Sequence, residues 1–152
     1  MAGHDVVIAI IGAWPDPKQE KMTNYSDPAR AYIPAMMANG IKRFFTVFGA
    51  GFLGDAEKIP KEWQDSDNLE INIINKVRRD MRIVWDLVLE SDLDYSIWCP
   101  ANFPSGPRTD QYILGENSFV GPEVTTGMVA ESMIKELTKN HFIKKRIGIA
   151  KK

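Results

Sequence analysis

Residues 44–55 read FFTVFGAGFLGD, an apolar run that passes directly into the pattern G-x-G-x-x-G at Gly49, Gly51 and Gly54. This is the spelling of the turn that binds the pyrophosphate of a dinucleotide between a strand and a helix. In such a turn the third glycine opens the helix, whose N-terminus holds the phosphates, and an acidic residue follows the next strand. The surrounding sequence therefore decides whether this stretch is a phosphate loop.

The sequence context does not favour a phosphate loop. After Gly54 the chain continues DAEKIPKEWQDSDN, with Pro60 and no apolar periodicity, and helical spacing resumes only near Leu69. The next expected strand ends at Cys99 and Pro100 without an acidic residue. The whole unit spans roughly 50 residues, against the roughly 30 of a compact strand-helix-strand unit. A bend or an active-site loop accounts for the glycines better than a phosphate loop does.

Outward from this stretch, apolar periodicity predicts alternating strands and helices. Near-continuous β-branched runs are typical of strands buried on both faces of a parallel sheet, whereas spacing of three or four residues indicates amphipathic helices. This alternation predicts an α/β fold, a mostly parallel Rossmann-like sheet of about four main strands flanked by helices on both faces. We expect strands at 5–12, 41–48, 94–99 and 146–150, short strands at 112–114 and 119–120, and helices at 26–39, 69–91 and 125–139.

The helices carry finer expectations. In the first helix, Ser26 or Asp27 offers an N-cap, and Pro34 predicts a kink or a later start. The helix at 69–91 is expected to bury Ile74 among its apolar positions, and the helix at 125–139 to bury Ile134.

Composition excludes several classes of protein. The 152 residues carry 19 basic and 20 acidic side chains, a balance that predicts neither a nucleic-acid-binding nor a membrane surface. Cys99 is the single cysteine, so the sequence offers no disulfide framework and no cysteine-based zinc site. The apolar run at 6–14 lacks the flanks of a signal peptide and is too short to span a bilayer. We predict a cytoplasmic protein.

Four blocks of the sequence resemble consecutive blocks of the atypical short-chain dehydrogenase/reductases, most closely the NmrA-like and biliverdin/flavin reductase-like branch. The resemblance covers nearly the whole chain, and the order and spacing of the blocks make it specific. The blocks are HDVVIAIIG at 4–12, ARAYIPAMMANGIKRFFTVFGAGFLGD at 29–55, RRDMRIVWDLVLESDLDYSIWCPANFPSGP at 78–107 and GPEVTTGMVAESMIKELTKNHFIKKRIGIA at 121–150.

The resemblance implies one partial NAD(P)-binding Rossmann-type domain over residues 1–152. In such proteins the strand before this glycine stretch is the fifth, and the phosphate loop lies far upstream of the block that starts at His4. The chain therefore looks truncated, and the cofactor it implies, NAD(P), would lose its phosphate contacts. The determinants of NAD against NADP preference would lie in the same upstream part.

The resemblance also implies cofactor-binding residues at the carboxyl ends of the strands, where ligands bind in such sheets. One group follows the first strand of this chain, near the adenosine; a second ends the next strand, beside the nicotinamide; and a third forms a loop over the nicotinamide ring. They are Gly12, Ala13 and Trp14; Phe48 and Gly49; and Pro100, Ala101, Asn102 and Phe103.

Catalytic residues are not assigned by the sequence. Phe48 stands where the family often carries a serine, and none of the four tyrosines begins the Tyr-x-x-x-Lys pair of classical members. Arg79 and Asp80 match a polar pair on the family's long helix, for which a solvated helix face is the favoured role. His141 has no cluster of metal-ligating residues near it, and we expect no metal site; Cys99 is expected to be a buried strand residue.

The strand predicted from Asp5 to Gly12 has a consequence for association. In a doubly wound sheet, loss of the first three strands would leave this strand as a long apolar edge with unpaired backbone groups. We therefore predict that the protein forms a homodimer, or binds another protein, through Asp5 to Gly12.

Three functions stay open at this point. The first is an NAD(P)H-dependent reductase, impaired by the absence of its phosphate loop. The second is a non-catalytic, partner-binding or redox-sensing NmrA-like protein. The third is a fragment of a longer reductase.

Overall fold

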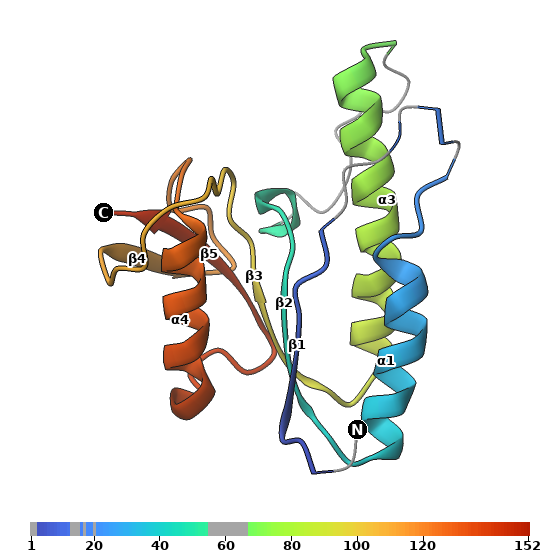
Figure 1. Ribbon diagram of the computed structural model, residues 1–152, viewed down its shortest axis with the longest axis vertical. Coiled ribbons are helices and arrows are strands. Elements are labelled where there is room, and N and C mark those ends of the chain that lie inside the picture. Colours follow the sequence, from blue (N-terminus) through green and yellow to red (C-terminus); the bar gives the residue numbers. More distant parts are fainter. Residues whose placement is uncertain (1–2, 13–15, 17, 20, 55–66) are drawn as a thin grey trace.

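The computed structural model describes residues 3–12, 16, 18–19, 21–54 and 67–152 and shows a sheet with helices on both sides (Figure 1). The five strands lie in the order β1-β2-β3-β5-β4. The predicted α/β class and Rossmann-like sheet are confirmed, with five strands where about four were expected. The strands are β1 (Val6–Ala9), β2 (Arg43–Val47), β3 (Asp94–Trp98), β4 (Tyr112–Glu116) and β5 (Lys145–Lys151); the helices are α1 (Ser26–Ala38), α3 (Leu69–Glu90), α4 (Thr126–Lys139) and the short 3-10 helix η1 (Ala50–Phe52).

The sheet is parallel except at one edge. β1 pairs with β2, β2 with β3, and β3 with β5, all in parallel, with Val7 beside Phe44 and Thr46 beside Ile97. β4 pairs antiparallel with β5, which places Leu114 beside Ile149. β1 lies at the opposite edge of the sheet. The carboxyl ends of β1, β2 and β3 therefore meet at one end of the molecule.

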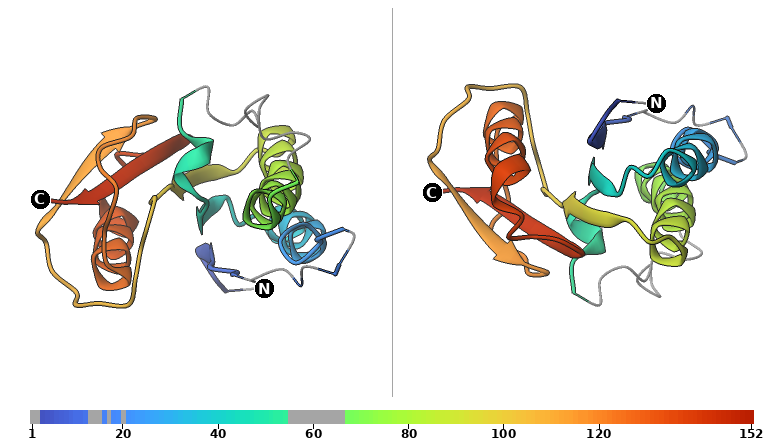
Figure 2. Two further views of the ribbon diagram at one scale, coloured as in Figure 1. Left: turned by 90° about the horizontal axis from the view of Figure 1, so that it is seen from above. Right: turned by 90° about the horizontal axis from the view of Figure 1, so that it is seen from below.

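Two cores lie on the two faces of this sheet. α1 and α3 pack side by side over one face, and α4 covers the other (Figure 2). Because side chains alternate along a strand, neighbouring residues of β2 enter different cores: Phe44 packs with α1 and α3, whereas Phe45 packs with Trp98 and α4. This explains why β2 reads as a continuous apolar run.

α1 begins differently from the expectation. Its N-cap is Tyr25, not Ser26 or Asp27, and the Tyr25 side chain makes no capping hydrogen bond. The cap comes from α3 instead, as described below. Pro34 lies inside the helix on its exposed side, so of the two expected outcomes, a kink or a later start, the later start is wrong.

α3 confirms the long helix predicted at 69–91, but the prediction placed the wrong isoleucine on the buried face of its first turns. Ile74 is 39% exposed, whereas Ile73 is 7% exposed. The first turns of α3 project beyond the carboxyl ends of the strands (Figure 1), so they do not pack on the sheet. Instead, both isoleucines border a cavity at this end of the molecule.

Two further expectations near the C-terminal half are wrong. The residues 119–120 are not a strand: Asn117 adopts a left-handed turn conformation with φ 47° after β4, and Phe119 is 61% exposed. Ile134 is also exposed, because α4 turns the polar Glu136 inward to pair with Arg43 of β2. Because both side chains of this buried ion pair are charged, the apolar periodicity of the sequence does not reveal that Glu136 faces the sheet.

Candidate functional site

A small cavity lies where the loops after β1, β2 and β3 converge. It has a volume of about 220 Å³, and we call it the strand-end cavity. Ligands of open α/β sheets bind at this end of the strands, because the loops there diverge and leave a crevice. Its lining residues are Ile10, Ile11, Gly12, Tyr25, Val47, Phe48, Gly49, Met81, Pro100, Ala101 and Phe103.

Most of the residues that the resemblance assigns to the cofactor line this cavity. Gly12, Phe48, Gly49, Pro100, Ala101 and Phe103 are brought together from three separate loops. Ala13 and Trp14 lie outside the described residues. Asn102 does not line the cavity: its backbone N–H donates to Pro122 O at 3.1 Å, and its carbonyl accepts from Val124 N at 2.9 Å. These backbone hydrogen bonds hold the loop after β3 against the segment that precedes α4.

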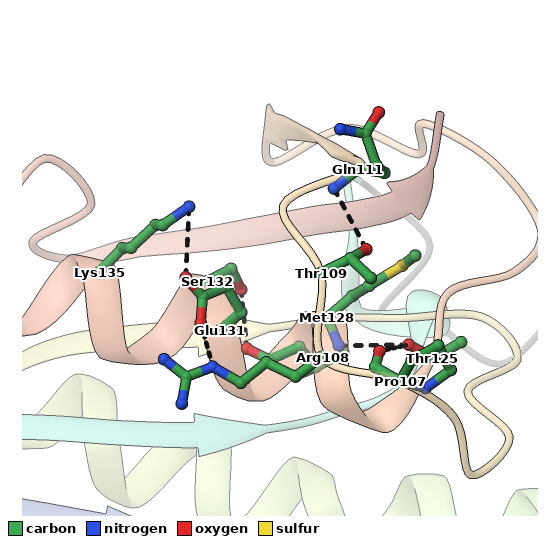
Figure 3. A network of polar contacts seen from close by, with 10 residues as sticks. Pro107, Arg108, Thr109, Gln111, Thr125, Met128, Glu131, Ser132 and Lys135 are labelled. Carbon is green, nitrogen blue, oxygen red and sulfur yellow. Dashed lines mark hydrogen bonds and ion pairs between the residues drawn. The ribbon is translucent and has the colours of Figure 1, made fainter.

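The loop after β3 is held at Pro107 and Arg108 by α4 and its N-cap (Figure 3). The Thr125 hydroxyl donates to Pro107 O at 2.8 Å and accepts from Met128 N at 3.2 Å, which caps α4. Arg108 pairs with Glu131, which also pairs with Lys135 at 3.3 Å. These contacts fix the loop to α4 a few residues beyond the part that lines the strand-end cavity.

A second, larger cavity adjoins the first. It has a volume of about 480 Å³ between η1 and the first turns of α3, and we call it the helix cavity. Gly49, Met81 and Ala101 line both cavities. The remaining lining residues of the helix cavity are Ala50, Gly51, Phe52, Ile73, Ile74, Val77 and Arg78. This cavity was not predicted from the sequence, although the pair Ile73 and Ile74, with a cation one turn later, was a detectable signal.

The glycine stretch forms the wall between β2 and this cavity. Gly49 precedes η1, and Phe52 is buried against Phe48 with ring centroids 4.9 Å apart. The Arg146 guanidinium donates to Phe52 O at 2.7 Å, and Gly54 N donates to the Asn117 side chain at 3.0 Å. Contacts with β5 and the turn after β4 thus hold the stretch as a tight bend. The interpretation as a bend or active-site loop fits this geometry.

The N-terminus of α1 is blocked by the protein itself. The Asp80 carboxylate, on α3, accepts from Tyr25 N at 2.8 Å and from Ser26 N at 3.3 Å. Asp80 is 1% exposed, so its expected place on a solvated helix face is wrong, whereas Arg79 is exposed as expected. A buried carboxylate at a helix N-terminus satisfies the donors that would otherwise bind a phosphate.

Burial sets the ionisation of two groups near the cavities. It raises the pKa of Cys99 to about 12, so the thiol is not a nucleophile, and the residue is buried as expected. Burial also lowers the pKa of Arg78, whose guanidinium remains charged because its ordinary pKa is so high. Within the described part of the chain, no three metal-ligating side chains cluster and no helix is both long and apolar enough to cross a bilayer.

Comparisons with known proteins identify the family and the fold of this chain. The sequence model of a family described as NAD(P)H-binding matches residues 1–140. No curated protein matches. Among solved structures, the oxidoreductase ylbE from Lactococcus lactis has a TM-score of 0.73 at 21% identity, over 99% of this chain and 64% of that one. A protein from Streptococcus pneumoniae described as an NADH-flavin reductase has a TM-score of 0.70 at 24% identity, over 99% and 73%.

A third similar structure contains a cofactor. It is a short-chain dehydrogenase/reductase from Veillonella parvula in complex with NADP, with a TM-score of 0.65 at 17% identity, over 98% of this chain and 64% of that one. This chain therefore spans 64–73% of the length of the three similar structures. The family match and the shared Rossmann-like fold confirm the resemblance to the atypical short-chain dehydrogenase/reductases; the NmrA-like branch stays a prediction. The chain belongs to the NAD(P)H-binding family.

Proposed function

We propose that the strand-end cavity binds the nicotinamide end of NAD(P)H, and that the chain is the hydride-transfer part of an NAD(P)H-dependent oxidoreductase. The observation that carries this proposal is the convergence of Gly12, Phe48, Gly49, Pro100, Ala101 and Phe103 around one cavity at the carboxyl ends of three parallel strands. The family match supports the cofactor class.

The lining of the cavity suits a nicotinamide ring. Pro100 is buried, and Phe103 is 42% exposed at the cavity wall, so its phenyl ring is available for an aromatic ring to stack on. The hydride comes from the cofactor itself, so the protein has to supply position and exclusion of water. Phe48 offers no hydroxyl to a carbonyl substrate; Tyr25 is the hydroxyl-bearing side chain in this cavity.

The same geometry supports weak binding of the rest of the cofactor. Among the described α-helices, the N-terminus of α1 is capped by Asp80, that of α3 by Asn68 and that of α4 by Thr125. At each of these three ends a side chain occupies backbone donors that a pyrophosphate would otherwise use. We therefore infer that this chain alone holds the nicotinamide and not the phosphates, an arrangement that would impair catalysis.

A titration with NADH, NADPH and reduced nicotinamide mononucleotide tests the proposal, with tryptophan fluorescence or calorimetry as the readout. The expected dissociation constants are on the order of 1 mM and agree within about tenfold for all three, because only the shared ring is bound. Dinucleotide binding at least about 100-fold tighter than mononucleotide binding would show that the phosphates are held. No binding of any of the three at about 10 mM would reject the proposed function.

Phe103→Ala tests whether the strand-end cavity is the site. Loss of a stacking ring is expected to weaken binding of the reduced mononucleotide by about three- to tenfold. Phe119→Ala is the matched control, because Phe119 is also an exposed phenylalanine but lines neither cavity. Equal affinities for the two variants would place the nicotinamide elsewhere.

A second candidate function, partner binding, is favoured by a separate observation. β1 is the edge strand of the sheet, and Ile8 and Ile10 are 42% and 64% exposed. We propose a second copy of this chain as the partner, because residues 6–12 carry no charge and two copies can pair without repulsion.

A further inference from the structure

We propose that the helix cavity binds an apolar organic anion whose charged group rests on Arg78. This inference rests on the proposed function, since it assigns the substrate class of the same site: the anion would be the molecule that faces the nicotinamide. It goes beyond the family match, which concerns the cofactor alone.

The size and lining of the helix cavity fit a small organic molecule. Its volume of about 480 Å³ lies within the range of ligand pockets. Ile73, Ile74 and Val77 form one wall from α3, and Phe52 contributes to the other from η1. Ile74 is 39% exposed, so an apolar ligand would remove aliphatic surface from water when it binds.

Arg78 is the one charged side chain among the described residues that line this cavity. Its guanidinium donates to Gly51 O at 3.3 Å, which anchors it at the η1 side. Burial lowers the pKa of this group, so its charge is partly withdrawn from water. A carboxylate, phosphate or sulfonate beside it would make charge-assisted hydrogen bonds to the planar guanidinium.

Gly51 allows this placement. A Cβ atom at residue 51 would lie 3.1 Å from Arg78 Cζ, closer than such atoms ordinarily approach. The absence of a side chain lets the guanidinium lie directly against the backbone of η1. The second glycine of the G-x-G-x-x-G pattern thus makes room for a cation of the protein itself.

The helix cavity also adjoins the proposed nicotinamide site. Gly49, Met81 and Ala101 line both cavities, so molecules bound in the two would be neighbours. This arrangement matches a reductase that brings a second reactant against its cofactor. An anion held by the Arg78 guanidinium at the η1 side could lay its apolar body along the isoleucines of α3.

Two fluorescent probes test the proposal because they differ mainly in charge: anilinonaphthalene sulfonate is an apolar anion, and N-phenylnaphthylamine is its neutral analogue. Fluorescence titration of the folded chain is expected to show about tenfold or more tighter binding of the sulfonate. Equal affinity for the two probes, or binding of neither, would overturn the proposal.

Variants of Arg78 test whether the preference for the sulfonate probe depends on this side chain. Arg78→Gln is expected to remove the preference for the sulfonate while leaving the affinity for the neutral probe within about twofold, and Arg78→Lys to restore part of it. Arg79→Gln is the matched control, because Arg79 is the neighbouring arginine on α3 but is exposed and lines neither cavity. A loss of preference in Arg79→Gln equal to that in Arg78→Gln would mean that a diffuse surface charge attracts the sulfonate.

Ile74→Trp keeps the test decisive if the Arg78 variants fail to fold. A tryptophan at this exposed position is expected to fill the cavity and weaken both probes by about tenfold or more. Leu89→Trp, on the same helix at a position 52% exposed and away from the cavity, should leave both unchanged. Unchanged probe affinity in Ile74→Trp would place the probes elsewhere and overturn the proposal.

The two proposals fail separately. If reduced nicotinamide mononucleotide binds and the sulfonate does not, the nicotinamide site stands and the anion class is wrong. If the sulfonate binds at Arg78 and no nicotinamide compound binds, the helix cavity is an anion site, but its assignment as the substrate site of a reductase is overturned.

Discussion

Asp80 decides at the scale of a single residue what the start of α1 can bind. Its carboxylate accepts from the backbone of Tyr25 and Ser26, 55 and 54 residues away in the sequence. Because the contact joins two helices, no local pattern around Ser26 or Asp27 indicates it. A helix end that reads as an ordinary cap is therefore closed by a distant side chain.

Asp80→Ala is expected to lower the free energy of unfolding by about 1–3 kcal/mol, because two buried backbone donors lose their acceptor. Urea denaturation followed by circular dichroism measures the change. Asp86→Ala is the control: Asp86 pairs with Arg82 at the surface of the same helix, and its loss should cost about 0–1 kcal/mol. Similar costs for the two variants would contradict a capping role for Asp80.

At the scale of elements, β1 is the part of the fold most open to another chain. Among the described strands it pairs with β2 alone, so one row of its backbone donors and acceptors faces outward. Two copies of β1 paired in antiparallel fashion would extend the sheet across the dimer. Nothing charged from Val6 to Gly12 opposes this pairing.

Sedimentation at tens of micromolar tests this dimer, which we expect to form and to dissociate in Ile8→Lys. A lysine at this exposed edge position brings like charges together in the pair. Ile113→Lys is the control, because Ile113 is similarly exposed but lies on β4, the other edge of the sheet. A monomeric parent protein, or dissociation by Ile113→Lys alone, would count against β1.

The elements also show how far sequence reasoning reaches. Strands and long helices were predicted within a few residues because their apolar periods are local properties. The residues at the strand-end cavity were implied by the family resemblance, and the rule that ligands bind at the carboxyl ends of strands agrees with their position. The helix cavity was missed because it depends on where α3 overhangs the sheet, which is set by packing. Ile74 and Ile134 were misassigned for the same reason, since Glu136 and the cavity take the place of apolar core.

At the scale of the whole molecule, the buried thiol of Cys99 makes the free energy of unfolding depend on pH in the alkaline range. Burial raises the pKa of Cys99 from the ordinary value of 9.0 to about 12. The raised pKa contributes stability that is complete below pH 9 and is lost as the pH rises toward 12, because the unfolded chain releases the proton first.

The expected slope from Cys99 is about −1.4 kcal/mol of unfolding free energy per pH unit between roughly pH 9 and 12. Urea midpoints from pH 7 to pH 11 measure it in the parent protein and in Cys99→Ala. The variant should start lower at neutral pH and decline less steeply above pH 9. Parallel curves would show that the thiol does not contribute to the alkaline loss.

The place of β5 in the sheet affects how the protein is made. β5 follows all the other described strands in sequence, yet it lies between β3 and β4. A ribosome therefore releases β1 to β4 and α4 before the strand that joins them exists. Until Lys145–Lys151 emerges, one edge of β3 and the apolar faces of Trp98 and Met128 lack their partner from β5. Nascent chains of this protein should thus depend on chaperones that shelter apolar surface until synthesis reaches β5.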